Sequence, residues 1–206
     1  MTKKLAFQQS EEHWESLLEQ LSNSKIQIAM VVTGGGTGAI SHCLRRSGAS
    51  LNFVEAVIPY SRMATQLYLG LEPTEGYASQ HTANALAQVA HSRATSLSEK
   101  DHRSFGIALT ATLPTKPHGA EANSAQNCCV HVASHNTQIR RAWSLYFAGQ
   151  QSDRDVAESI AEQMFLIALQ DSLYQNGIVV SSDPLLPLKS AGLQVSMTHL
   201  FDSSGA

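Results

Sequence analysis

Apolar residues recur along the chain at helical spacing in three places. Residues 11–22 and 79–94 carry apolar or small residues at i, i+3, i+4 and i+7, which predicts two amphipathic helices. Ser10 is expected to cap the first of these helices and Ser79 the second. Residues 152–173 carry a stripe of the same kind, so they predict a third and longer helix.

Short runs of branched apolar residues predict the strands. These runs cover residues 25–32, 52–58, 105–111, 128–134 and 140–147, with a further strand expected within 193–201. The two runs on either side of the sequence HNTQ are expected to pair with each other. Short helices are expected at 39–46 and within 59–70, where Gly70 ends the second one. Helices that alternate with strands, followed by a run of strands, predict a three-layer α/β/α sandwich with a mixed central sheet.

Composition narrows the range of functions. A chain of 206 residues suits a single domain, here residues 1–206, and 43 % apolar against 15 % charged residues favours much buried surface, including an oligomer interface. The net charge of −3 and the absence of Lys or Arg runs give no electrostatic support for nucleic-acid binding. No apolar run approaches the roughly 20 residues of a membrane span. The N-terminus also lacks the apolar segment of a signal peptide, so a cytoplasmic location is expected.

Cysteine and histidine residues do not suggest a metal centre. Cys43, Cys128 and Cys129 are odd in number and form no C-x-x-C motif, so buried reduced thiols are expected. His131 and His135 are four residues apart, but they lie in a predicted strand and do not share a helical face. We therefore expect no metal ligands.

The sequence TGGGT, residues 33–37, joins the first predicted strand to a helix. Glycine lets the backbone adopt positive φ and approach a ligand closely, and the start of a helix favours an anion such as phosphate. The loop is not a Walker A motif, since no G-K-[ST] follows, and it does not match the G-x-G-x-x-G dinucleotide motif. Two interpretations stay open from spacing alone: an anion site, or a tight structural turn.

Six short motifs in order resemble the C-terminal domain of the CinA family, the fold of the nicotinamide-nucleotide amidases. They are TGGGT (33–37), SGAS (47–50), PYSR (59–62), ASQHTA (78–83), ALTA (108–111) and FAG (147–149). The match spans about residues 11–173 and leaves 174–206 as a tail of uncertain role. No single motif is decisive, and the order and spacing of the six carry the resemblance.

The resemblance implies a site at the ends of the strands. Thr33 stands where the amidases of the family have a nucleophilic serine, and Tyr60 is retained, so these two are the candidate catalytic residues. The candidate ligand-binding residues are Gly34, Gly35, Gly36, Thr37, Ser61, Arg62 and Thr110. Thr65 stands where the family has the lysine that helps to activate the serine, and Gln150-Gln151 replace an Asp-Arg pair. Threonine cannot act as a base near neutral pH, and loss of a base typically costs on the order of 10²–10⁴-fold in rate.

Three functional hypotheses follow. The first is a CinA-like protein that binds a pyridine nucleotide or similar small phosphorylated ligand, such as nicotinamide mononucleotide, with amidase activity weak or lost and no cofactor. The second is an active amide hydrolase in which Thr33 is the nucleophile, with His42 considered as a substitute base. The third is a non-catalytic partner subunit. In each case a homo-oligomer is expected, with a dimer the commonest arrangement.

Overall fold

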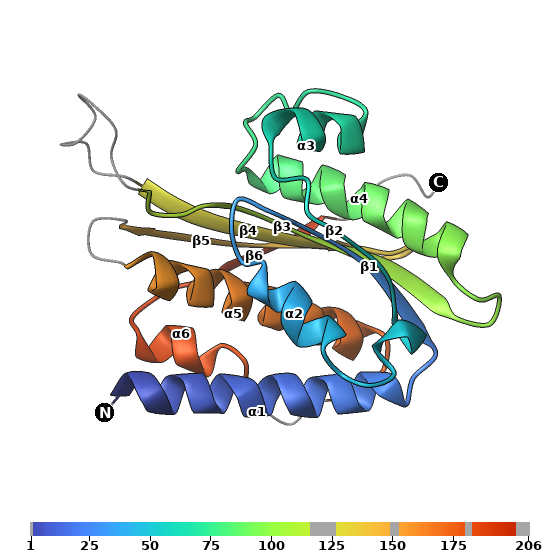
Figure 1. Cartoon of the computed structure of the whole chain (residues 1–206), viewed down its shortest axis with the longest axis horizontal. Helices are drawn as coiled ribbons and strands as arrows, with labels where there is room; N and C mark the ends of the chain where they lie inside the picture. Colours follow the sequence, from blue (N-terminus) through green and yellow to red (C-terminus); the bar gives the residue numbers. More distant parts are fainter. Residues whose placement is uncertain (1, 116–126, 149–152, 180–182, 201–206) are drawn as a thin grey trace.

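A central sheet of mixed direction organises the computed structural model, which describes residues 2–115, 127–148, 153–179 and 183–200 (Figure 1). Its strands are β1 (Ile26–Thr33), β2 (Phe53–Val57), β3 (Arg103–Thr112), β4 (Asn127–His135), β5 (Arg140–Ala148) and β6 (Ser196–Leu200). Within these residues the strand order is β2-β1-β3-β4-β5-β6. β1 pairs in parallel with β2 and β3, and the remaining pairs are antiparallel. The mixed sheet predicted from the sequence is therefore confirmed.

Helices cover both faces of this sheet. They are α1 (Thr2–Ser22), α2 (Gly38–Leu44), α3 (Arg62–Leu69), α4 (Gln80–Leu97), α5 (Arg154–Gln175) and α6 (Leu186–Ser190), with one 3₁₀ turn at Ala49–Leu51. Figure 1 shows α3 and α4 on one face and the other helices on the opposite face, where α1 lies outside α2 and α5. This arrangement is the predicted three-layer sandwich, with two tiers of helices on the α5 side.

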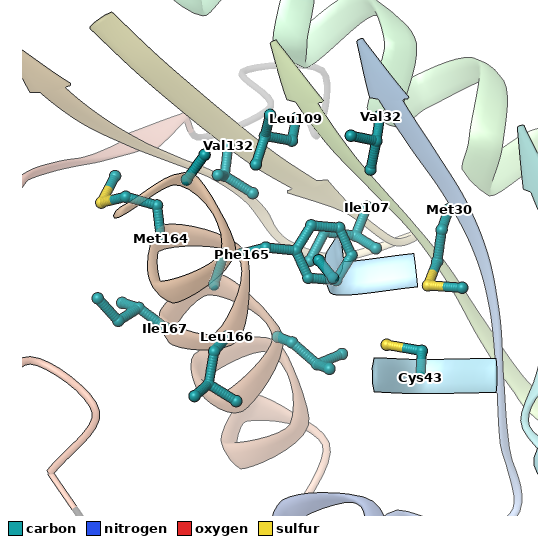
Figure 2. Close-up of a cluster of buried hydrophobic side chains, with 14 of the residues drawn as sticks. Met30, Val32, Cys43, Ile107, Leu109, Val132, Met164, Phe165, Leu166 and Ile167 are labelled. Atoms are coloured by element: carbon teal, nitrogen blue, oxygen red, sulfur yellow. The ribbon is translucent and has the colours of Figure 1, made fainter. Parts of the chain in front are cut away.

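The larger core lies between the sheet and α5. Figure 2 shows Met30, Val32, Ile107, Leu109 and Val132 of the sheet together with Met164, Phe165, Leu166 and Ile167 of α5 and Cys43 of α2. All eight residues of β1 are buried, which explains why this strand reads as a continuous apolar run. Burial also raises the pKa of the Cys43 thiol, so this cysteine is an inert part of the core.

The second core lies under α4 and consists mainly of small residues. Ala83, Ala87 and Ala90 of α4 are fully buried against the sheet. A Cβ atom at Gly106 of β3 would lie 2.1 Å from the backbone nitrogen of His91, so helix and strand are in backbone contact there. The small side chains on this face of α4 therefore permit close packing against the sheet.

Helix boundaries differ from the sequence prediction at one end of the chain. The prediction that Ser10 caps the first helix is wrong, because α1 begins at Thr2 and Ser10 lies within it. The Ser10 hydroxyl instead donates to Gln163 Oε1 at 3.0 Å, which links α1 to α5. Ser79 caps α4 as predicted, and Gly70 ends α3 with a φ of 75°.

The C-terminal segment is more ordered than the sequence predicted. Within the tail after residue 174, α6 packs through Leu188, which is buried. β6 pairs with β5 and extends the sheet by one antiparallel strand. In the part of the chain that the structure describes, no helix combines the length and apolarity that a bilayer crossing requires.

Candidate functional site

The carboxyl end of β1 delivers Thr33 to the turn between β2 and α3. The Thr33 hydroxyl donates to the carbonyl oxygen of Pro59 at 3.0 Å, and the Thr65 hydroxyl of α3 donates to the same oxygen at 2.9 Å. Thr33 and Thr65 are both buried. The two positions at which the resemblance expects a nucleophile and a lysine are thus brought together through one backbone carbonyl.

This geometry leaves the Thr33 hydroxyl without activation. A backbone carbonyl accepts a hydrogen bond but does not take up the proton, whereas an attacking hydroxyl requires a base. The Thr65 hydroxyl cannot serve as that base near neutral pH and is itself a donor to Pro59. The two threonines therefore act as a hydrogen-bonded brace between β1, the β2–α3 turn and α3.

A row of buried polar side chains crosses the sheet from Thr33. Thr33 is the register partner of Thr110 in β3, which pairs with His131 in β4, which pairs with Ser144 in β5. All four are buried. Each lies two positions along its strand from a residue that packs against α4, so all four lie on the face that α4 covers. The Thr110 hydroxyl donates to the carbonyl of Ser79, the capping residue of α4, at 3.3 Å.

His131 and Ser144 form the centre of this row. His131 Nδ1 and Ser144 Oγ are 2.7 Å apart, and Ser144 Oγ also lies 3.4 Å from Gln80 Oε1. The imidazole ring meets the exposed ring of Tyr146 edge-on, with centroids 5.4 Å apart. Burial lowers the pKa of His131, which favours its neutral form.

Sequence reasoning placed His131 in a strand but did not find this row. A signal for it was present, because polar and apolar residues alternate on two strands that were expected to pair. The alternating positions are Cys129 and His131 on β4, and Ser144 and Tyr146 on β5. Register, which that reasoning did not derive, decides that His131 faces Ser144. No group of three His, Cys, Asp or Glu side chains in the described ranges is arranged to hold a metal ion.

Packing explains each glycine of the TGGGT loop. Gly34 has a φ of 81°, and a Cβ atom there would lie 2.0 Å from the carbonyl oxygen of Ala111. A Cβ atom at Gly35 would lie 2.3 Å from Leu113 Cδ1. Gly36 has a φ of 76°, a conformation that side chains disfavour.

A carboxylate of the chain itself occupies this loop. The Gly36 N–H donates to Glu158 Oε2 of α5 at 2.5 Å. Arg154 makes two hydrogen bonds to Glu158 Oε1, at 2.9 and 2.6 Å, and also reaches the carbonyl oxygens of Gly34 and Pro114. The turn is therefore tied to the start of α5 by a carboxylate that stands where an anionic ligand was expected. Sequence reasoning missed Arg154 and Glu158.

The remaining predicted ligand-binding residues differ in their exposure. Tyr60 is 68 % exposed and has no polar partner among the described residues. The Ser61 hydroxyl accepts a hydrogen bond from Ala64 N and caps α3. The Arg62 guanidinium lies 5.5 Å from the ring centre of Tyr77 and is exposed. Tyr60, Ser61 and Arg62 follow Pro59 directly, so they lie beside the Thr33 brace.

Two further positions of the predicted site lie at the starts of α2 and α5. Thr37 is exposed at the N-cap position of α2, and its side chain makes no capping bond. Gln150 and Gln151, which were expected to replace an Asp-Arg pair, lie outside the described residues. Asp153 and Arg154 form such a pair slightly later in the sequence, where α5 begins.

Two cavities of the described part lie away from Thr33. One of about 330 Å³ lies between α5, β5 and β6, and one of about 280 Å³ lies among α1, α5 and α6. His42, considered above as a base, lines the second cavity and stacks on Trp14 with ring centroids 4.8 Å apart. It is packed between α1 and α5, and among the described residues it makes no polar contact with Thr33, so its place in the fold is that of a packed histidine.

Comparison with solved structures identifies the fold. The chain is similar to a competence-damaged protein (CinA) superfamily protein from Klebsiella pneumoniae, with 13 % identity, a TM-score of 0.61, and coverage of 81 % of this chain and 98 % of that one. It is also similar to a CinA superfamily protein from Escherichia coli, with 16 % identity, a TM-score of 0.59 and coverage of 78 % and 88 %. A competence/damage inducible protein from Agrobacterium tumefaciens matches at 19 % identity, a TM-score of 0.52 and coverage of 81 % and 95 %.

These likenesses confirm the expected resemblance in the fold. No protein-family model matches the sequence, and no curated protein matches it either. The chain therefore has a CinA-like α/β fold, and its activity has to be argued from its own residues.

Proposed function

We propose that this CinA-like chain binds a small phosphorylated ligand of the nicotinamide mononucleotide type and hydrolyses its amide weakly or not at all. The observation that carries the second half of this proposal is the shared acceptor of Thr33 and Thr65, the carbonyl of Pro59. A hydroxyl that donates to a carbonyl and has no base beside it is a poor nucleophile. The alternative of an active hydrolase would require a base that the described residues do not supply at Thr33.

Arg62 supports the first half of the proposal. Its guanidinium is exposed, pairs with no carboxylate among the described residues, and lies at the start of α3. A guanidinium can contact phosphate in a charge-assisted and bidentate manner. The neighbouring exposed ring of Tyr60 offers a surface on which a flat heterocycle can stack.

The glycine loop can bind the phosphate only if Glu158 moves away from it. The Gly36 N–H is already bonded to Glu158, so a phosphate there would have to displace that carboxylate. We therefore assign the primary phosphate contact to Arg62. The contribution of Gly34, Gly35, Gly36 and Thr37 to binding stays a prediction that depends on movement of Glu158.

Release of ammonia from nicotinamide mononucleotide tests the catalytic half. The wild-type chain is expected to give a rate far below the common enzymatic range of about 1–10³ s⁻¹. The double variant Thr33→Ser with Thr65→Lys restores the residue types of the amidases and is expected to raise the rate. A wild-type turnover within the enzymatic range would contradict the proposal and favour the hydrolase alternative.

Calorimetric titration tests the binding half. Nicotinamide mononucleotide is expected to bind at least about tenfold more tightly than its uncharged riboside, since the phosphate gains a charge-assisted contact. Arg62→Gln should remove that preference, and Arg46→Gln, at a half-buried arginine just beyond α2, should not. Equal binding of nucleotide and riboside, or none at millimolar concentration, would favour the partner-subunit alternative.

Exposed apolar residues around β2 and α3 support the expected homodimer. Leu51, Ile58, Met63, Leu67 and Leu71 are each about half exposed or more. Clusters of exposed apolar residues often mark protein–protein contacts. Light scattering should show a species larger than 22.2 kDa, the mass of one chain. A monomer at all concentrations would contradict this expectation.

A further inference from the structure

The cavity of about 280 Å³ among α1, α5 and α6 has the composition of a small-molecule site. Its walls are mostly apolar and include Ile160 of α5, Leu188 of α6 and Leu193 beyond it. Its polar end is formed by Glu11, His42 and Glu162. Apolar walls with a few converging polar groups are typical of ligand pockets, whose volumes begin at roughly 300 Å³.

His42 is held in place but lacks hydrogen bonds. Its ring stacks on Trp14 with an interplanar angle of 4°, so its orientation is fixed. Nδ1 lies 3.8 Å from Glu11 Oε2 and Nε2 lies 3.6 Å from Glu162 Oε2. Both separations are too long for a hydrogen bond, and the buried Nδ1 has no hydrogen-bond partner in the described residues.

Among the described residues, no donor forms a hydrogen bond to Glu162. Its side chain is 25 % exposed, and one of its oxygens lies 3.6 Å from His42 Nε2. Glu11, in contrast, forms an ion pair with Arg45 at 2.5 Å. A carboxylate removed from much of the solvent is stabilised by a hydrogen-bonded cation, and the part of the chain that the structure describes supplies none to Glu162.

We propose that this cavity binds a small organic ammonium ion, with its apolar part between α5 and α6. The ammonium group donates to Glu162 and to the neighbouring Nε2 of neutral His42, the two polar groups that line this end of the cavity within 3.6 Å of each other. The site is separate from Thr33 and Arg62 and does not depend on the proposed nucleotide binding. A primary ammonium ion suits it, because three N–H donors can reach two acceptors at once.

Three compounds of matched size test this site by calorimetry: 2-phenylethylammonium, the neutral 2-phenylethanol and the anionic 3-phenylpropanoate. The ammonium ion is expected to bind at least about tenfold more tightly than the alcohol, and the anion least tightly, since only the first compound pairs with Glu162. A change in the fluorescence of Trp14, which stacks on His42, should accompany binding.

Variants distinguish the contribution of the polar end to affinity from that of the apolar walls. Glu162→Gln should lower the affinity for the ammonium ion at least about tenfold and leave that for the alcohol unchanged. Glu12→Gln, at an exposed position of α1 outside the cavity lining, is the matched control and should change neither. Ala191→Phe narrows the cavity from its exposed rim. It should lower the affinity for both compounds and leave the melting temperature unchanged.

Two outcomes would overturn the proposal. If the three compounds bind equally, the cavity is an apolar hole without charge selectivity. If none binds at millimolar concentration to a folded wild-type chain, Glu162 and His42 form an internal ion pair only.

Discussion

The glycine loop and the α1–α5–α6 cavity both meet α5, one turn apart, and they differ in how their polar groups are satisfied. At the loop, the Glu158 carboxylate accepts from the Gly36 N–H and from Arg154. At the cavity, Glu162 accepts no hydrogen bond from the described residues, and His42 Nδ1 is buried without a partner. Both carboxylates are about a quarter exposed.

This difference bears on the two interpretations of the glycine loop that the sequence left open, an anion site and a tight structural turn. The three consecutive glycines suggested a ligand loop, yet crowding by Ala111 and Leu113 accounts for Gly34 and Gly35. The cavity, in contrast, carries no motif, but it leaves polar atoms open to a ligand. Glycine thus indicates that the backbone is close to something, and only the fold tells whether that neighbour is a ligand or the protein itself.

The largest effect is expected from a side chain added at the loop. Gly34→Ala should lower the free energy of unfolding by about 3 kcal/mol or more, because a Cβ atom meets the Ala111 carbonyl and φ is positive. Gly70→Ala is the control, since Gly70 also has a positive φ but open space around it, and should cost about 1 kcal/mol. Chemical denaturation measures both. Equal losses would show that the loop is not packed as described.

The next effect compares the two carboxylates directly. Glu158→Ala should cost about 2 kcal/mol, because it removes charge-assisted hydrogen bonds to Gly36 and Arg154. Glu158→Gln should cost less, since the amide oxygen can still accept from Gly36. Glu162→Ala should cost about 0.5 kcal/mol or less, because the ion pair that it breaks among the described residues is a long contact to His42. A similar loss at both positions would mean that Glu162 is structural, and would weaken the case for an ammonium site.

A smaller effect on stability concerns two buried histidines, His131 of the polar row and His91 of α4. Burial lowers the pKa of His131 and of His91 below the ordinary value of 6.5. The unfolded chain therefore binds protons at a higher pH than the folded chain. The resulting stability is fully present above pH 6.5 and is lost as the pH falls below that value.

Denaturation between pH 8 and pH 5 measures this dependence. His131→Gln should reduce the dependence of the free energy of unfolding on pH, and His91→Gln should reduce it further. Ser144→Ala retains the imidazole and should keep most of the slope. A wild-type stability that rises as the pH falls toward 5 would contradict the lowered pKa values.

The smallest effect is expected at Thr37. Its side chain makes no capping bond to α2, so Thr37→Ala should change the free energy of unfolding by no more than about 0.5 kcal/mol. Ser79→Ala, which removes the bond from Thr82 N, should cost about 1 kcal/mol. If Thr37→Ala alters nucleotide binding while stability is unchanged, the loop takes part in ligand contact after all.

Much of the fold followed from local patterns. The strands, the α4 cap at Ser79 and the end of α3 at Gly70 depend on periodicity and on neighbouring residues, so they were predicted near their observed positions. The start of α1 was not, because residues before Ser10 lack a clear apolar stripe. At the site, the adjacency of Thr33 and Thr110 followed from their strand-end positions and is present in the β1–β3 register.

The sequence by itself determined most of the helices and strands, although not the start of α1 or the short α6. It also determined that Thr33 and Thr65 lack the chemistry of a serine–lysine pair. Only the tertiary structure decided what each polar atom meets, because partners such as Gly36 and Glu158 are 122 residues apart. Nothing in local spacing encodes that contact, since it depends on how α5 packs across the ends of β1 and β3. The same packing fills the loop with Glu158 and leaves Glu162 facing a cavity, although the two residues differ by a single helical turn.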